Sequence, residues 1–243
     1  MDRHGISPNT VRNLKVLPVI PWIHLDSAEM PGGGELRLKQ RGSEFSIMLG
    51  SIELMNSRLS GSEEALATMS CERIGGLKRP QILIGGLGMG FTLRASLAVL
   101  GEDARISVAE LVPSVVALAR GPMSGIFGTC LDDPRVTIIE EDVGRLISTG
   151  KAAYDAILLD VDNGPEGLTR KANDDIYSVE GLRAAGWALR TGGILAVWSS
   201  GPNSQFTRRL GKAGYVVEEV SVRANKKGRG ARHVIWFATK RQH

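Results

Sequence analysis

The sequence predicts an α/β fold built around a doubly wound, parallel sheet, and three observations carry that prediction. First, the apolar run 82–84 is followed at once by a glycine-rich turn and then by helical spacing over 91–100. A buried parallel strand reads as such a continuous apolar run. Second, strand-like and helix-like stretches alternate from there to residue 213, which is typical of β-α-β units. Third, the alternating stretches 215–223 and 233–239 close the chain as a hairpin.

Residues 1–31 form the first of three predicted segments. They contain four prolines, which disfavour a helix. We expect an extended N-terminal arm that covers another surface, such as that of a partner subunit. A half-ordered tail is the alternative.

A small β-hairpin domain is expected over 32–76. Residues 35–39 alternate with period two, 45–49 form a second apolar strand, and an Arg-Gly-Ser turn signal separates them. A helix then follows, with Ser62 as its expected N-cap, and it ends near residue 74 at two glycines.

The third segment, 77–243, is expected to be a nucleotide-binding domain. After the helix at 91–100, its strands are expected at 104–111, 135–140, 154–160 and 192–199. Its helices are expected at 113–119, 143–148, 178–190 and 204–213, with a loop over 121–133.

The turn after the first of these strands has the spacing G-x-G-x-G from Gly86 to Gly90. Glycines let a ligand approach the backbone, and the next helix turns its N-terminal N–H groups toward that ligand. The dinucleotide fingerprint fails because its sixth position is Phe91. The pattern resembles instead the first motif of class I S-adenosylmethionine-dependent transferases, which implies cofactor contacts at Gly86, Leu87, Gly88 and Gly90. A tight turn without a ligand is the alternative.

Acidic residues follow the next two strands of the predicted sheet. Glu110 ends the strand 104–111, where a carboxylate can accept hydrogen bonds from both hydroxyls of a ribose, beside Leu111. Asp142 and Val143 follow the strand 135–140. We expect them beside an adenine, although Asp142 is equally suited to cap the helix that begins there.

Two more aspartates lie at the end of the strand 154–160. In a doubly wound sheet this end of the strand faces the ligand crevice. Asp160 and Asp162 are therefore expected beside the reacting group, with capping of the loop as the alternative. Asp160 is our first candidate for the base or orienting acid of catalysis, and Asp162 is the second.

Composition limits the remaining function classes. The chain has 243 residues, a net charge of +4 and two cysteines in no metal-binding spacing, so we expect no metal, no disulfide framework and a cytoplasmic protein. It shows no apolar run of the ~20 residues that a membrane span needs, so no membrane partner is expected. Nucleic acid is not expected as a partner either, since no aromatic residues accompany the basic turn at 226–232.

Together these motifs resemble the spermidine synthase-like branch of the class I transferases, over about residues 32–240. The stretches that carry the resemblance are ILIGGLGMGFTLR (82–94), VAELVPSVVALAR (108–120), EEDVGRL (140–146) and YDAILLDVDNGP (154–165). A helix bearing Glu63 and Glu64 belongs to the same resemblance. It implies a Rossmann-like methyltransferase sheet with an antiparallel last strand behind a small β-hairpin domain. It also implies S-adenosylmethionine or decarboxylated S-adenosylmethionine as cofactor, a small-molecule amine as acceptor, and a homodimer.

Two positions depart from the pattern that the resemblance sets. Gly88 stands where true aminopropyltransferases have an aspartate that holds the aminopropyl amine, and Asn163 replaces an aspartate after the fourth strand. Losing an acid that faces a buried ammonium costs a few kcal/mol. We therefore favour methyl transfer to an amine or hydroxyl acceptor. Aminopropyl transfer, the spermidine synthase reaction, is the alternative, and a non-catalytic nucleotide-binding protein is the second alternative.

Histidine and tryptophan positions add little at this level. His4, His24, His233 and His243 have no metal-ligand spacing, so we expect structural or exposed roles for them. Trp198, near the end of the strand 192–199, is expected in the core or at the border of an acceptor pocket.

Overall fold

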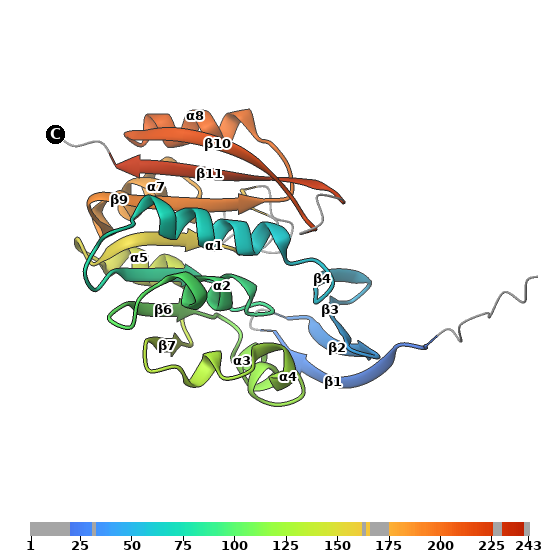
Figure 1. Ribbon diagram of the computed structural model, residues 1–243. Coiled ribbons are helices and arrows are strands. Elements are labelled where there is room, and N and C mark those ends of the chain that lie inside the picture. Colours follow the sequence, from blue (N-terminus) through green and yellow to red (C-terminus); the bar gives the residue numbers. More distant parts are fainter. Residues whose placement is uncertain (1–19, 31–32, 162–163, 166–174, 226–229, 241–243) are drawn as a thin grey trace, which may run out of the picture.

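A computed structural model describes residues 20–30, 33–161, 164–165, 175–225 and 230–240, which fold around two sheets (Figure 1). The larger sheet has seven strands: β5 (Gln81–Gly85), β6 (Arg105–Ala109), β7 (Val136–Ile139), β8 (Tyr154–Leu159), β9 (Leu189–Ser199), β10 (Tyr215–Arg223) and β11 (Arg232–Lys240). The smaller sheet has four: β1 (Ile23–Glu29), β2 (Glu35–Arg41), β3 (Glu44–Leu49) and β4 (Ile52–Asn56).

The larger sheet has the predicted doubly wound order, β10-β11-β9-β8-β5-β6-β7. Neighbouring strands from β9 to β7 run parallel, and β11 is antiparallel to both β9 and β10. The α/β fold with an antiparallel last strand is therefore confirmed. The order reverses at β5, so the crevice between the ends of β5 and β8 lies at the switch point where such sheets bind ligands.

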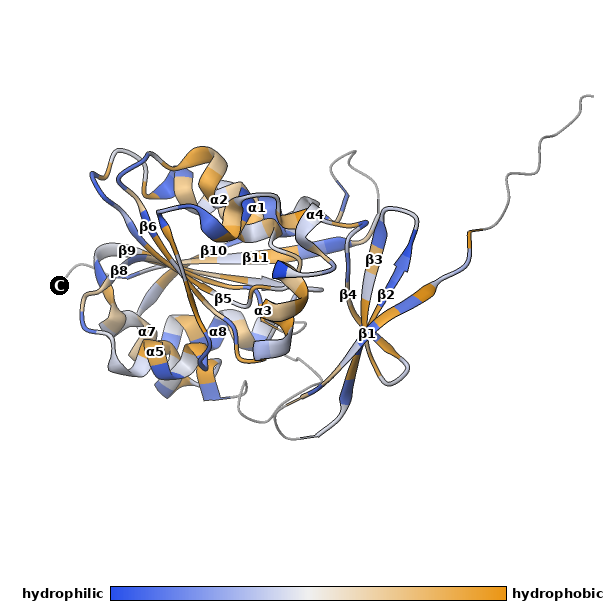
Figure 2. Ribbon diagram, turned by 90° about the horizontal axis from the view of Figure 1, so that it is seen from below, coloured by the Kyte–Doolittle hydropathy of each residue, from blue (hydrophilic) through white to orange (hydrophobic). Residues whose placement is uncertain are grey.

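Helices cover both faces of this sheet, which Figure 2 shows edge-on. The helices are α1 (Gly61–Arg73), α2 (Phe91–Val99), α3 (Pro113–Arg120), α4 (Ser124–Phe127), α5 (Val143–Thr149), α7 (Val179–Ala188) and α8 (Ser204–Lys212). Helices α1 to α4 pack with one face, and α5, α7 and α8 pack with the other. In β5, Ile82 and Ile84 face the first layer and Leu83 faces the second, so both faces of the strand are buried. That is the reason for its continuous apolar run.

The smaller sheet differs from the expected hairpin. Strand β1 pairs with β2, so the sheet begins inside the segment 1–31 that the sequence predicts to be an arm. Strand β4 adds a fourth member beside β3. Leu38 and Ile47 point from this sheet into the shared core and are fully buried. The residues 1–19 of the expected arm lie outside the described ranges.

Other differences are local. The stretch 121–133, expected as a loop, contains α4 and the 3-10 turn Cys130–Asp132, because Phe127 and Leu131 bury their side chains there. Strand β9 begins at Leu189, before the two glycines that were expected to start it. Within the described ranges, none of the helices is both long and apolar enough to cross a membrane.

Candidate active site

The glycine turn opens at the end of β5. Gly86 has φ +89°, and a Cβ there would lie 2.6 Å from the carbonyl oxygen of Asp160, so only glycine fits. Gly88 also has a positive φ, +50°, but the nearest atom to its Cβ position is the Met55 sulfur at 3.7 Å. The backbone at Gly88 is therefore open toward the space between the two sheets.

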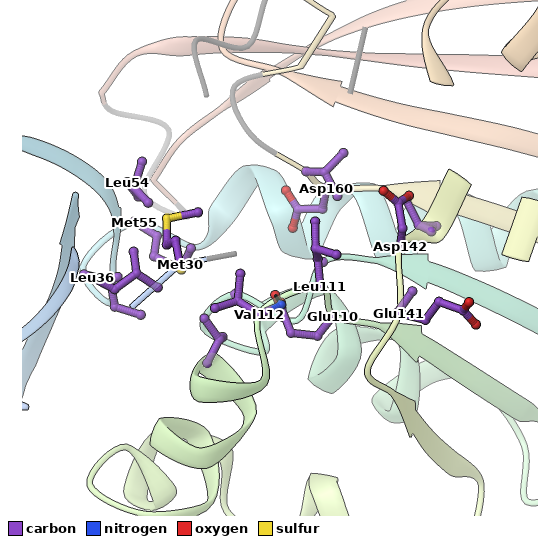
Figure 3. A pocket seen from close by; sticks show the side chains of 17 residues that line it. Met30, Leu36, Leu54, Met55, Glu110, Leu111, Val112, Glu141, Asp142 and Asp160 are labelled. Carbon is purple, nitrogen blue, oxygen red and sulfur yellow. Dashed lines mark hydrogen bonds between the residues drawn. The ribbon is translucent and has the colours of Figure 1, made fainter. Parts of the chain in front are cut away.

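That space is a cavity of about 140 Å³ between the glycine turn and the smaller sheet. Figure 3 shows Glu110 and Asp160 on facing sides of it, with Met30, Leu36 and Met55 closing the side toward the smaller sheet. The walls combine apolar side chains with a few carboxylates. This composition suits a nucleoside, whose flat base prefers apolar contact and whose hydroxyls need acceptors.

Glu110 joins the glycine turn to the end of β6. Its Oε2 accepts a hydrogen bond from the backbone N–H of Leu87 at 3.0 Å, and its Oε1 accepts one from Val112 at 2.9 Å. Burial raises the pKa of the Glu110 carboxyl, and the backbone N–H groups around it partly oppose that rise. These groups belong to Leu87, Gly88, Leu111 and Val112, and the carboxylate also borders the cavity. The acid thus lies in the cavity wall where the sequence predicts it.

Asp142 and Val143 form the far wall of the cavity. The Asp142 side chain accepts a hydrogen bond from the N–H of Gly144 at 2.7 Å and so caps helix α5. Val143 is buried and also lines the cavity. The capping interpretation of Asp142 is confirmed, and the same residue remains available to a ligand from the cavity side.

Asp160 lies just past the end of β8 and is partly buried. The Thr92 hydroxyl donates a hydrogen bond to its Oδ2 at 2.7 Å. Burial raises the pKa of Asp160 to about 7, and the nearby Glu63 carboxylate adds to the rise, while the Thr92 hydrogen bond opposes it. A carboxyl with this pKa changes charge near neutral pH.

A second cavity of about 290 Å³ adjoins the first, and Leu54, Met55, Gly88 and Asp160 border both. Its other polar lining residues are Asn56, Glu63 on α1, Ser200 and His233 on β11. Trp198 also lines this cavity, which agrees with the second of its two expected positions, at the border of a pocket. The two cavities therefore form one site, with one half beside Glu110 and an adjoining half that is reached past Gly88.

Sequence reasoning missed the contacts of Ser62 and His233. Ser62 does not cap helix α1; its hydroxyl instead donates to Oε2 of Glu63 at 2.6 Å and lies 2.9 Å from Nδ1 of His233. His233 is thus neither merely structural nor simply exposed, because its ring lines the second cavity. No motif signals this contact, since Ser62 and His233 are 171 residues apart in the chain.

The other residues that were predicted to form the site do not all line the two cavities. Leu111 lines the first cavity and Leu87 lines the second. Gly90 borders neither cavity; it precedes helix α2 as its N-cap, and a Cβ at this position would clash with the ring of Phe127. Asp162, together with Asn163, lies outside the described residues.

Charge is distributed unevenly in this site. Among the described residues that line the two cavities there is no lysine or arginine. The carboxylates in the same walls are Glu63, Glu110, Glu141, Asp142 and Asp160. Only Glu141 has an ion-pair partner among described residues, Arg145 at 2.9 Å. Such a site favours a cationic ligand.

Known proteins were compared with the chain at the levels of sequence and structure. No family model matches it. The polyamine aminopropyltransferase of Mycobacterium tuberculosis strain H37Rv is 29% identical over 145 residues, which is 56% of this chain and 27% of that protein. The polyamine aminopropyltransferase of Corynebacterium efficiens is 32% identical over 126 residues, which is 50% of this chain and 23% of that protein. The chain therefore spans about a quarter of the length of these curated relatives.

Solved structures give a wider match. The spermidine synthase of Thermotoga maritima superposes with a TM-score of 0.71 at 16% identity, over 90% of this chain and 73% of that one. A spermidine synthase in complex with the transition-state analogue AdoDATO gives a TM-score of 0.70 at 17% identity, over 90% and 72%. The chain has the spermidine synthase fold. Its two-sheet arrangement follows that fold, and the comparisons give no support to the preference for methyl transfer.

Proposed function

We propose that this protein is a transferase of the aminopropyltransferase type, which uses decarboxylated S-adenosylmethionine and a small amine acceptor. The observation that carries the proposal is the charge of the site: several carboxylates and, among the described lining residues, no lysine or arginine. The decarboxylated cofactor carries a sulfonium and an ammonium, both positive. Ordinary S-adenosylmethionine would add a carboxylate to an already acidic cavity, at an electrostatic cost.

The residues present fit that cofactor. The open backbone at Gly88 leaves room between the cavities, with the Met55 sulfur at 3.7 Å from the Cβ position. Glu110 would hold the ribose hydroxyls, and Asp142 and Val143 would border the adenine. When bound, the cofactor supplies a carbon made electrophilic by its sulfonium, so the protein has little more to do than position the acceptor and remove a proton.

Asp160 and Glu63 take the acceptor's side of the site. Both line the second cavity, where burial raises the pKa of each carboxyl, and Glu63 raises the pKa of Asp160 further because two carboxylates repel. A protonated amine between them relieves that repulsion. We assign Asp160 the role of orienting the attacking amine. The same pair compensates for the missing acid at Gly88, because it places negative charge beside the opening that an aminopropyl chain would pass.

Calorimetry with purified protein tests the proposal. Decarboxylated S-adenosylmethionine is expected to bind at least about tenfold more tightly than S-adenosylmethionine. This ratio corresponds to a difference of about 1.4 kcal/mol in binding free energy. Incubation of the decarboxylated cofactor with a panel of diamines is expected to give an aminopropylated amine by mass spectrometry.

A matched pair of variants tests which carboxylate produces the preference for the decarboxylated cofactor. Glu63→Gln is expected to abolish the preference for the decarboxylated form. Glu64→Gln is the control, because Glu64 is the next residue of α1 but lines neither cavity. Tighter binding of S-adenosylmethionine, with methylated rather than aminopropylated products, would overturn the proposal. Cofactor binding without any product would leave a nucleotide-binding protein instead.

A further inference from the structure

His233 uses one ring nitrogen for a hydrogen bond inside the protein and leaves the other nitrogen open. Its Nδ1 lies 2.9 Å from the Ser62 hydroxyl. Its Nε2 has no hydrogen-bond partner among the described residues, and it is accessible rather than buried. Because the His233 ring lines the second cavity, Nε2 is available to a ligand that enters there.

The Ser62 hydroxyl determines which ring nitrogen carries the proton. A hydroxyl has one proton, and Ser62 donates it to Oε2 of Glu63 at 2.6 Å. Toward His233 the serine oxygen is therefore an acceptor, which requires a proton on Nδ1. A neutral imidazole has one N–H, so Nε2 then carries a lone pair and no proton. Burial lowers the pKa of His233 and so favours this neutral form.

Trp198 holds the imidazole in this orientation without occupying its open nitrogen. The indole ring meets the His233 ring edge-on, with centroids 4.9 Å apart and an interplanar angle of 82°. The indole Nε1 is buried and makes no hydrogen bond with any described residue, so it does not donate to Nε2. Val222, which lies opposite His233 on β10, has an apolar side chain with no donor. Nε2 therefore keeps its lone pair for a ligand.

The polar residues of the second cavity differ in whether they also touch the first cavity. Asp160 borders both, so it lies at the junction where the proposed cofactor would present its electrophilic carbon. His233 borders the second cavity and not the first. An acceptor that attacks from beside Asp160 therefore extends the rest of its chain toward His233.

We propose that His233 binds the distal ammonium of a diamine acceptor by accepting an N–H hydrogen bond on Nε2, while Asp160 orients the amino group that attacks. Ser62 is a positioning residue, because it acts by fixing the tautomer of His233. The inference rests on the proposed function for the identity of the acceptor. It narrows the acceptor class to amines with a second cationic end that carries N–H donors.

A neutral hydrogen-bond acceptor adds a selectivity that charge alone does not give. The carboxylates of the site attract any cation by its charge, including a quaternary ammonium. A lone pair on Nε2 stabilises only a cation that has an N–H donor. We therefore expect a preference for 1,4-diaminobutane over the same chain with three methyl groups on its distal nitrogen.

Ring-nitrogen NMR at pH 8 tests the tautomer and the contact without turnover. In the free protein His233 is expected to carry its proton on Nδ1, and Ser62→Ala is expected to lose that preference. Ser70→Ala is the matched control, because it removes a buried hydroxyl of the same helix that has no hydrogen-bond partner among the described residues. Saturating 1,4-diaminobutane, added with methylthioadenosine, is expected to shift the Nε2 resonance of the wild type.

Three NMR results would count against the proposal. A wild-type proton on Nε2, or bound diamine that leaves the Nε2 resonance unshifted, would overturn the role of His233. An unchanged tautomer in Ser62→Ala would overturn the positioning role of Ser62.

Two substitutions of His233 separate ligand binding from support of helix α1. His233→Asn keeps a donor near the position of Nδ1 but has no atom at the position of Nε2. His233→Gln can bring its amide oxygen near the position of Nε2 but loses the donor to Ser62. We expect His233→Asn to raise KM for 1,4-diaminobutane by about tenfold or more with kcat within about twofold, because the lost bond is made equally in ground and transition states. We expect His233→Gln to keep KM within about threefold of wild type. The reverse order of the two variants would show a structural role alone and would contradict the proposal.

The methylated analogue, (4-aminobutyl)trimethylammonium, tests the same contact from the side of the ligand. The wild type is expected to have a kcat/KM at least about tenfold higher for 1,4-diaminobutane, and His233→Asn is expected to lose most of that preference. An equal preference in both proteins would contradict the contact. If the wild type binds the diamine but transfers no aminopropyl group, the proposed function fails and the NMR titration still decides the contact. If it binds no diamine, both fail.

Discussion

The hydroxyl of Thr92 donates a 2.7 Å hydrogen bond to Oδ2 of Asp160, across the mouth of the glycine turn. Helix α2 thereby supports the acid that ends β8, and the bond stabilises the ionised form of the carboxyl. Because burial and Glu63 raise the pKa of Asp160 to about 7, loss of this opposing bond would change the ionised fraction of the carboxyl at neutral pH.

The acceptor KM should therefore depend on pH. A protonated amine needs an ionised Asp160, so KM is expected to rise as the pH falls through about 7. Thr92→Val keeps the shape of the side chain but removes the donor. A hydrogen bond to a charged group contributes about 1.5–3 kcal/mol and one pKa unit corresponds to 1.36 kcal/mol, so this KM transition should move upward by about 1 unit or more. Steady-state kinetics at a series of pH values measures it, and an unmoved transition would show that Asp160 does not hold the amine.

Stability should also report on Asp160. Between about 4, the ordinary pKa of aspartate, and about 7, the folded protein retains a proton that the unfolded chain has released, so the free energy of unfolding falls as pH rises through this window. Asp160→Asn removes that loss while keeping an acceptor for Thr92. The variant is expected to be more stable than wild type at pH 8 by about 1–3 kcal/mol, and equally stable at pH 4.

Urea denaturation at the two pH values makes the comparison. Asp155→Asn is the opposite-sign control, because Asp155 accepts from the Gln81 N–H at 2.7 Å and pairs with Arg190 at 2.8 Å. That variant is expected to be less stable than wild type at pH 8 by about 1 kcal/mol. If Asp160→Asn is also less stable than wild type at pH 8, ionisation of the Asp160 carboxyl does not lower the free energy of unfolding at that pH.

Gly86 and Gly88, two of the three glycines with positive φ in the turn, should respond differently to alanine. Gly86→Ala is expected to cost about 3 kcal/mol or more and to abolish nucleoside binding, because its Cβ would meet the Asp160 carbonyl at 2.6 Å. Gly88→Ala is expected to cost only about 1–2 kcal/mol, the penalty of a left-handed conformation, since nothing lies nearer than 3.7 Å. Thermal unfolding and calorimetry of both variants test the difference, which would vanish if the turn rearranged freely.

Glu110 should couple ligand binding to the shape of the turn. Glu110→Gln keeps the length of the side chain, but its amide NH2 group cannot accept the hydrogen bond from Leu87 or Val112 that one carboxylate oxygen now takes. We expect a loss of about 1–2 kcal/mol in stability and a 10-fold or greater loss of nucleoside affinity. Calorimetry with methylthioadenosine measures the latter. Unchanged affinity would exclude Glu110 as the residue that binds the ribose.

Residues close together in sequence were the ones that could be placed in advance. The strand, the glycine turn and the acid at Glu110 follow one another within one β-α-β unit, so their spacing is enough to bring them together. Asp142 was placed for the same reason, since helix caps depend on neighbouring residues. The motif did not indicate that a side chain at Gly90 would clash with Phe127, because Phe127 lies in a later segment of the chain.

Contacts between distant segments could not be placed. The pairing of β1 with β2 could not be predicted, because the prolines in the segment 1–31 do not indicate which residues of β1 lie opposite which residues of β2. His233 meets Ser62 only because β11 inserts between β9 and β10 and passes the start of α1. The raised pKa of Asp160 likewise arises from burial and from Glu63, which is far from it in sequence.

A crystal structure of the protein with methylthioadenosine, the nucleoside that aminopropyl transfer leaves behind, tests the central claim most directly. We expect the ribose hydroxyls within hydrogen-bond distance of the Glu110 carboxylate, the adenine beside Asp142 and Val143, and the sulfur over Gly88 at the opening to the second cavity. A nucleoside bound elsewhere on the protein, or bound here with its ribose turned away from Glu110, would contradict the account.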